Sequence, residues 1–308
     1  MITKSTANTN LRTGFIKRSI ARLIQFYIIT LILYSTHVTS EIISETLPNN
    51  IVATAEYKSG DPNKPAVIVL HGFLQTYTFL ATHNIIEGLS DLDFTVVGPN
   101  LSLGVPARKR SLQCEAVHQH TLNDDLDEIN FWVRWLQNKG HKKVIFVGHS
   151  WGSQHALAYL SSQRDTSNIV GLVAISLVPS EENSVLMSRQ LEQALTKQLA
   201  SNATLHKFVL GFCQKYTSTT QGYLSYAEWN DKKLLSALAD ITRNGKPVFT
   251  ILGSADKRLR KMWIKDLTNA GSTISVVKDA NHFFSSAYEF DLIDELDVVL
   301  KTFVLAND

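Results

Sequence analysis

The sequence predicts an α/β fold built on a doubly wound, mostly parallel sheet. Its short apolar runs are continuous rather than alternating, as in strands that are covered on both faces. Segments with helical spacing of apolar residues separate these runs, and strand–helix–strand alternation is typical of a parallel sheet. With 308 residues, 44% of them apolar, the chain is long enough to bury the core of one such domain.

Six apolar runs are predicted as strands of this sheet. They cover residues 65–72, 94–100, 143–149, 169–179, 247–253 and 273–279. An earlier run, residues 51–60, is predicted as an antiparallel strand at the edge. Residues 180–246 contain no strand-like run, and Met187, Leu191, Leu195 and Leu199 recur every four residues. We therefore expect a helical cap insertion at about 180–246, placed to act as a lid over the carboxyl ends of the strands.

The N-terminus has the pattern of a secretory signal. Residues 1–22 contain five basic residues and no acidic residue, and the apolar run LIQFYIITLILY follows. Small residues then precede Glu41, where a signal peptidase would cut. The prediction is a signal peptide over 1–40 and an exported domain over 41–308, periplasmic or secreted. An uncleaved membrane anchor is the alternative, although the apolar run is short for a membrane span.

Charge and cysteine content refine this picture. The formal charge of +2 includes the five basic residues of the leader, and without them 25 basic residues face 28 acidic ones. No basic stripe points to nucleic acid, so we expect no nucleic-acid partner. Both cysteines, Cys114 and Cys213, lie in the exported part. Export permits a disulfide between them, and two free buried thiols are the equal alternative.

The strongest functional motif is Gly148-His149-Ser150-Trp151-Gly152. A buried strand enters it and a helix leaves it, which is the context of a nucleophile elbow. The turn forces the serine into a strained conformation, so its neighbours two residues away must be small. A serine in an ordinary structural turn is the alternative.

A serine hydroxyl needs a base, and the base needs a carboxylate that orients it. His282 follows the last strand, and Asp256 follows the strand before it. The carboxyl ends of parallel strands meet at one edge, so both side chains are predicted beside Ser150. Glu181 or Glu182, after the 169–179 strand, is the alternative acid. The backbone N–H groups of Phe73 and Trp151 are predicted to bind an oxyanion.

At these residues the sequence resembles the α/β-hydrolase fold family, in its serine-nucleophile, esterase- and lipase-like branch. The resemblance runs from about residue 51 to the C-terminus and rests on HGF (71–73), GHSWG (148–152), GSAD (253–256) and ANHFF (280–284). It implies hydrolysis of esters, thioesters or amides through an acyl-enzyme. A serine at 150 argues against the dehalogenase and epoxide-hydrolase members, which use a carboxylate nucleophile.

Two further clusters lie in the loop after the 94–100 strand. His118 and His120, near Cys114, are too few for a metal site, so a polar loop is predicted and no metal is expected. Arg108, Lys109 and Arg110 are predicted as a solvated loop, with attraction of an anionic substrate as the alternative.

These observations predict an exported serine hydrolase of small-molecule acyl substrates, with carboxylic esters as the first expectation and no cofactor. The catalytic residues are expected to be Ser150, Asp256 and His282. A peptidase, amidase or acyltransferase on the same residues is the alternative activity. A non-catalytic binding protein on this fold is the alternative from another class. A membrane partner is expected only if the N-terminal segment is retained.

Overall fold

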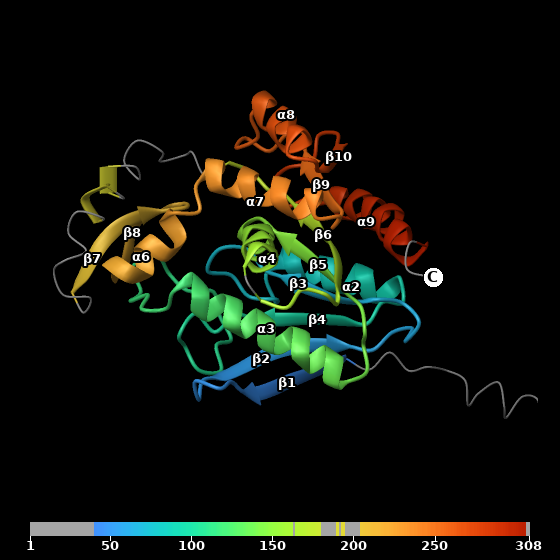
Figure 1. The fold of residues 1–308 in the computed structure, drawn as a ribbon, viewed down its shortest axis with the longest axis horizontal. Helices are drawn as coiled ribbons and strands as arrows, with labels where there is room; N and C mark the ends of the chain where they lie inside the picture. Colours follow the sequence, from blue (N-terminus) through green and yellow to red (C-terminus); the bar gives the residue numbers. More distant parts are fainter. Residues whose placement is uncertain (1–39, 163, 180–188, 191, 195–203, 306–308) are drawn as a thin grey trace, which may run out of the picture. The chain divides into compact units, whose positions relative to one another are not determined.

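An eight-stranded sheet forms the centre of the computed structural model, which describes residues 40–162, 164–179, 189–190, 192–194 and 204–305 (Figure 1). The strand order is β1-β2-β4-β3-β5-β6-β9-β10, and β2 alone runs antiparallel to both of its neighbours. The other pairs are parallel, as the sequence predicts. The strands are β1 (Ser40–Thr46), β2 (Val52–Lys58), β3 (Ala66–Leu70), β4 (Val96–Asn100), β5 (Val144–His149), β6 (Ile169–Ile175), β9 (Val248–Gly253) and β10 (Thr273–Val277).

Helices cover both faces of the sheet (Figure 1). They are α2 (Leu80–Asp91), α3 (Leu122–Asn138), α4 (Trp151–Ser161), α7 (Asp231–Arg243), α8 (Lys261–Asn269) and α9 (Tyr288–Leu305). A further helix, α6 (Thr220–Ala227), packs instead against a separate two-stranded sheet. Side chains of α3, α4, α7 and α8 share one apolar cluster, and those of α2 and α9 share the other. Along β3, Ile68 belongs to the first cluster, whereas Val67 and Val69 belong to the second. Burial on both faces explains why the strands read as continuous apolar runs.

The antiparallel strand predicted over 51–60 is β2, but it does not form the edge of the sheet. β1 pairs with β2 along its whole length, from Ser40 to Thr46, and takes the edge position. Ile43 is the one buried residue of β1. A strand that buries so little has almost no apolar signal, because edge strands are mostly solvated.

The predicted helical insertion is correct only in part for the described residues of 180–246. These residues contain a β-hairpin, β7 (Leu205–Leu210) and β8 (Cys213–Thr219), followed by α6 and α7. Gly211 takes a φ of +57° at the hairpin turn, a conformation that suits glycine. The four residues that carried the helical spacing, Met187 to Leu199, lie outside the described residues. Of the two helices α6 and α7, only α7 packs on α4 and so extends the layer of helices that covers this face of the sheet.

A disulfide joins Cys114 to Cys213, with a Cα–Cα distance of 5.3 Å. The sequence analysis favoured neither this disulfide nor two free thiols. The bond connects the long loop after β4 to the first residue of β8. It therefore fixes the hairpin to the main domain across 99 residues of sequence.

The predicted leader, residues 1–40, lies outside the described residues except for Ser40. None of the helices in the described ranges is long and apolar enough to cross a membrane.

The disulfide should contribute measurably to stability. Replacing both cysteines by serine is expected to lower the free energy of unfolding by up to about 4–5 kcal/mol, because the unfolded chain then loses a long closed loop. Urea denaturation of the variant and of the oxidised wild type measures the difference. Two reactive thiols in unfolded, unreduced wild type would contradict the bond itself.

Candidate active site

Ser150 lies between the last residue of β5 and the first residue of α4. Its backbone has φ +55° and ψ −117°, a strained conformation for a residue with a side chain. The N–H of Ser150 donates to the carbonyl of Ile175 at 2.8 Å, which ties the turn to the end of β6. The predicted elbow is therefore a real strand–turn–helix junction with Ser150 at its tip.

The two flanking glycines are required by backbone packing. A Cβ on Gly148 would lie 2.4 Å from the nitrogen of Ser153, and one on Gly152 would lie 2.1 Å from the carbonyl oxygen of Leu70. Both contacts are with backbone atoms, which cannot rotate away. Gly152 thus lets α4 approach the end of β3.

The structure brings the three predicted catalytic side chains together. His282 Nε2 lies 3.0 Å from Ser150 Oγ, and His282 Nδ1 lies 2.6 Å from Asp256 Oδ2. Asp256 and His282 are buried, with exposures of 6% and 5%. With Nδ1–H donating to the carboxylate, Nε2 is left as the acceptor for the serine hydroxyl. Glu181 and Glu182, the alternative acids, lie outside the described residues, and Asp256 occupies the position that they would need.

Asp256 is held in its ionised form. Burial raises the pKa of this carboxyl, but the hydrogen bond and the charge of His282 outweigh burial. The backbone N–H of Arg258 also donates to Asp256 Oδ1 at 3.0 Å and favours the charged form. The pKa of Asp256 therefore lies below its ordinary value, so an acceptor faces His282 at neutral pH.

Two residues that sequence reasoning missed hold the backbone of His282. The hydroxyl of Ser176 donates to the carbonyl of His282 at 2.7 Å, and His149 Nε2–H donates to the same oxygen at 3.0 Å. Burial lowers the pKa of His149 to about 3, so its ring remains neutral beside His282. His149 stands in the GHSWG motif, but nothing in the sequence distinguishes its role from that of a filler residue.

The two residues predicted to supply the oxyanion donors are in contact through their side chains. The rings of Phe73 and Trp151 are in contact, with centroids 4.1 Å apart. Trp151 is the first residue of α4, and the N–H groups of a first helical turn have no acceptor within the helix. Among the described residues, the N–H of Phe73 also has no acceptor. Two unpaired N–H groups beside the serine suit a developing oxyanion.

Arg108 supports the loop that carries Phe73. The structure corrects the predicted solvated loop, because Arg108 is 3% exposed while Lys109 and Arg110 face solvent. Its guanidinium donates to the carbonyls of Leu101 and Arg110 and to His71 Nε2, at 2.6 to 3.1 Å. His71 also accepts from the N–H of Leu101, so its Nδ1–H donates to the carbonyl of Gly72. This chain of contacts fixes the residue directly before Phe73.

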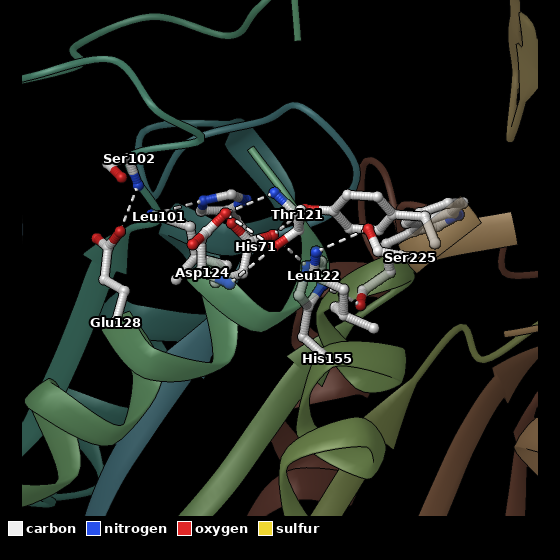
Figure 2. A network of polar contacts seen from close by, with 12 residues as sticks. His71, Leu101, Ser102, Thr121, Leu122, Asp124, Glu128, His155 and Ser225 are labelled. Atoms are coloured by element: carbon white, nitrogen blue, oxygen red, sulfur yellow. Dashed lines mark hydrogen bonds and ion pairs between the residues drawn. The ribbon is translucent and has the colours of Figure 1, made fainter. Parts of the chain in front are cut away.

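Two buried carboxyls of α3 extend this polar network, part of which Figure 2 shows. Glu128 accepts from the N–H of Ser102 at 2.8 Å. Asp125 accepts from His155 at 3.0 Å and from the hydroxyl of Tyr226. Burial raises the pKa of Glu128 to about 7, against the lowering effect of the Ser102 hydrogen bond. Burial also raises the pKa of Asp125, but its histidine neighbours and Tyr226 outweigh burial and lower it.

The predicted polar loop at His118 and His120 is likewise wrong, because both side chains are buried. The ring of His118 stacks on Tyr216, with centroids 4.3 Å apart. Burial lowers the pKa of His118 to about 4 and also lowers that of His120. The sulfur of Cys114 is in the disulfide. No group of three or more potential metal ligands occurs in the described ranges.

A pocket opens over Ser150 and His282. Phe73 and Trp151 form one wall, and Gly211 and Phe212 from the hairpin turn reach the same pocket. The rings of Phe73 and Phe212 meet edge to face, 5.5 Å apart. The described part of the insertion therefore borders the site through the hairpin turn and through α7, whose Asp231 and Leu234 also line the pocket.

A family described as the alpha/beta hydrolase fold matches residues 65–257, more than half of the chain. The chain belongs to the α/β-hydrolase fold family. A curated relative, Epoxide hydrolase A of Mycobacterium tuberculosis, is 31% identical over 96 residues. That match covers 31% of this chain, and the chain spans only 27% of the length of the curated relative.

Solved structures share the α/β-hydrolase fold at low sequence identity. The α/β hydrolase GrgF from Penicillium sp. sh18 has a TM-score of 0.64 and 14% identity, with 87% of this chain and 100% of that chain covered. An esterase of Pyrococcus furiosus has a TM-score of 0.57 and 17% identity, covering 87% and 92%. The thioesterase domain from the curacin biosynthetic pathway has a TM-score of 0.57 and 18% identity, covering 86% and 99%.

Glu128 should make stability depend on pH. Between its ordinary pKa of 4.5 and about 7, the folded protein holds a proton that the unfolded chain has released. The contribution of Glu128 to stability is therefore expected to fall as pH rises through this interval and to level off above pH 7, whereas the buried histidines His118 and His149 contribute the opposite slope below pH 6.5. Glu128→Gln should remove this fall, which amounts to roughly 3 kcal/mol, while its carbonyl still accepts from Ser102. Denaturation series from pH 4 to 8 measure the effect.

Asp127→Asn is the matched control, because Asp127 is an exposed carboxylate on the same helix, with its side chain 70% exposed. It should keep the wild-type pH profile. A Glu128→Gln protein with an unchanged profile would show that Glu128 titrates normally in the fold.

Proposed function

We propose that the protein is an exported serine hydrolase that cleaves small to medium carboxylic esters. The observation that carries the proposal is the continuous chain of hydrogen bonds from Ser150 Oγ through His282 to Asp256. Membership of the α/β-hydrolase fold family supports the same chemistry.

In the acylation step, Ser150 Oγ forms a bond to the ester carbonyl carbon while His282 Nε2 takes the hydroxyl proton. Asp256 stabilises the resulting imidazolium through the Nδ1–H contact. Collapse of the intermediate breaks the bond to the leaving alkoxide, which receives the proton from His282. Water then attacks the acyl-enzyme as His282 removes its proton, and Ser150 is regenerated with release of the acid.

The negative charge of the intermediate would lie on the carbonyl oxygen, next to the N–H groups of Phe73 and Trp151. The N-terminus of α4 adds a partial positive charge at the same place. Fixed donors of this kind lower the barrier by roughly 3–4 kcal/mol each. Arg108 and His71 keep the first of these donors in position.

A serine at 150 supports acyl transfer over epoxide opening, even though one curated relative is named an epoxide hydrolase. Attack of the serine hydroxyl on an epoxide carbon would open the ring and leave an ether on the serine, which water does not hydrolyse under these conditions, so the serine would not be regenerated. An acyl ester on the serine is readily hydrolysed, so a serine nucleophile suits esters.

Export is the second part of the proposal. The basic leader with its apolar run supports a signal peptide, and the Cys114–Cys213 bond suits an oxidising compartment.

Ser150 should react with a fluorophosphonate probe, because the adjacent His282 activates its hydroxyl. Ser150→Ala is expected to abolish labelling and to reduce kcat on p-nitrophenyl butyrate by roughly a million-fold. Intact-mass measurement after labelling and initial rates of ester cleavage check both outcomes.

Ser161→Ala makes the same chemical change at the exposed end of α4 and should label and turn over normally. Folded wild type that does not label would overturn the proposed activity. Faster turnover of peptide amides or of epoxides than of esters would overturn the ester assignment.

The mature protein should begin at Glu41, because a signal peptidase would cut after Ser40. Mass spectrometry of the protein recovered from the exported fraction measures its N-terminus. A full-length chain in the membrane fraction would identify the N-terminal segment as an anchor instead.

A further inference from the structure

Arg258 stands in the pocket with hydrogen-bond donors that the fold does not use. It follows β9 and lies two residues after Asp256, and its side chain, 26% exposed, lines the pocket together with Ser150 and His282. Its charge contributes to lowering the pKa of Asp256 and of His149, which places the guanidinium close to the base of the site.

The side chain of Arg258 has a single weak contact within the described part of the chain. Its Nε lies 3.7 Å from Asp256 Oδ1, and no acceptor among the described residues lies within hydrogen-bond distance of its terminal nitrogens. Arg108 differs, because its guanidinium donates to three protein acceptors. A partly buried guanidinium without partners is costly unless something else supplies an acceptor.

Two acidic groups lie near Arg258 in the described part of the chain, and both are already engaged. Asp231 also lines the pocket, but its carboxylate is 3.2 Å from Arg260. Asp256 is bound to His282 and balances the imidazolium during acyl transfer. The remaining polar groups of the pocket include the neutral amides of Gln75 and Gln154. Among the described residues that line the pocket, Arg258 is the only lysine or arginine.

We propose that Arg258 selects ester substrates that carry a carboxylate, by binding that carboxylate with its free terminal nitrogens. The inference rests on the proposed function and names the substrate class of the same site. A planar carboxylate matches the guanidinium fork and accepts two parallel hydrogen bonds. A monoanion fits better than a dianionic phosphate, because Asp231 and Asp256 would repel the second negative charge.

The test compares pairs of esters that differ only in charge. On the acyl side, the mono-p-nitrophenyl ester of adipic acid is set against its methyl-capped analogue. On the leaving-group side, the butyrate of 3-hydroxybenzoic acid is set against the butyrate of 3-hydroxybenzamide. In at least one pair, wild type is expected to show a kcat/KM about 10- to 100-fold higher for the carboxylate, the range of a hydrogen-bonded charge.

In the preferred pair, Arg258→Met should reduce the ratio of the two kcat/KM values to about one, and Arg258→Lys should restore part of it. The ratio is an internal standard, because a general loss of activity lowers both members of the pair. Lys257→Met is the matched control, since it removes the same charge from an exposed neighbour in the same loop and should keep the wild-type ratio.

The outcomes separate the two proposals. Equal turnover of both members of each pair, or a ratio that Arg258→Met leaves unchanged, would overturn the role of Arg258 while the hydrolase assignment stands. If Lys257→Met also lost the preference for the carboxylate ester, the preference would depend on the total positive charge of the loop and not on contact with Arg258. This result would also overturn the role of Arg258. An enzyme that neither labels at Ser150 nor cleaves any ester would overturn the proposed function first.

Discussion

The close approach of α4 to the end of β3 is the constraint on which the site depends. Gly152 packs against the carbonyl of Leu70, and no side chain fits between them. This contact places Trp151 beside Phe73 and forces Ser150 to turn at a positive φ. The strain at Ser150 persists because β6, through the carbonyl of Ile175, and the packed helix hold the turn from both sides. The other polar groups of the site are arranged around this fixed point.

Much of the site could be predicted because its parts follow the ends of strands. Ser150 comes directly after the buried strand β5, Asp256 shortly after the buried strand β9, and His282 in the loop after the edge strand β10, and parallel strands bring such positions to one edge of the sheet. The mostly parallel sheet was predictable for the same reason, since burial on both faces leaves long apolar runs. The disulfide could not be decided, because sequence does not show whether Cys114 and Cys213 come within bonding distance.

The supporting residues could not be predicted. Arg108 lies between exposed residues in a charged stretch, and its burial depends on neutral acceptors from Leu101 and His71 that only the folded loop supplies. His149 acts through the backbone carbonyl of His282, which lies far away in sequence. The β7–β8 hairpin was mistaken for helix because polar residues interrupt its apolar ones and no continuous apolar run marks either strand, and β1 was not predicted because it buries only Ile43.

The insertion does not interrupt the sheet. β6 pairs with β9 from Leu172 to Ile175, although the hairpin, α6 and α7 lie between these two strands in the sequence. The chain leaves the sheet after β6 and returns to the neighbouring position. The part of the excursion that precedes α7 can therefore be lengthened, shortened or exchanged without a change in strand register, whereas α7 packs on α4 and belongs to the core. Variation in this segment could reshape the pocket wall at Phe212 while the elbow at Ser150 stays the same, which allows substrate preference and chemistry to evolve separately.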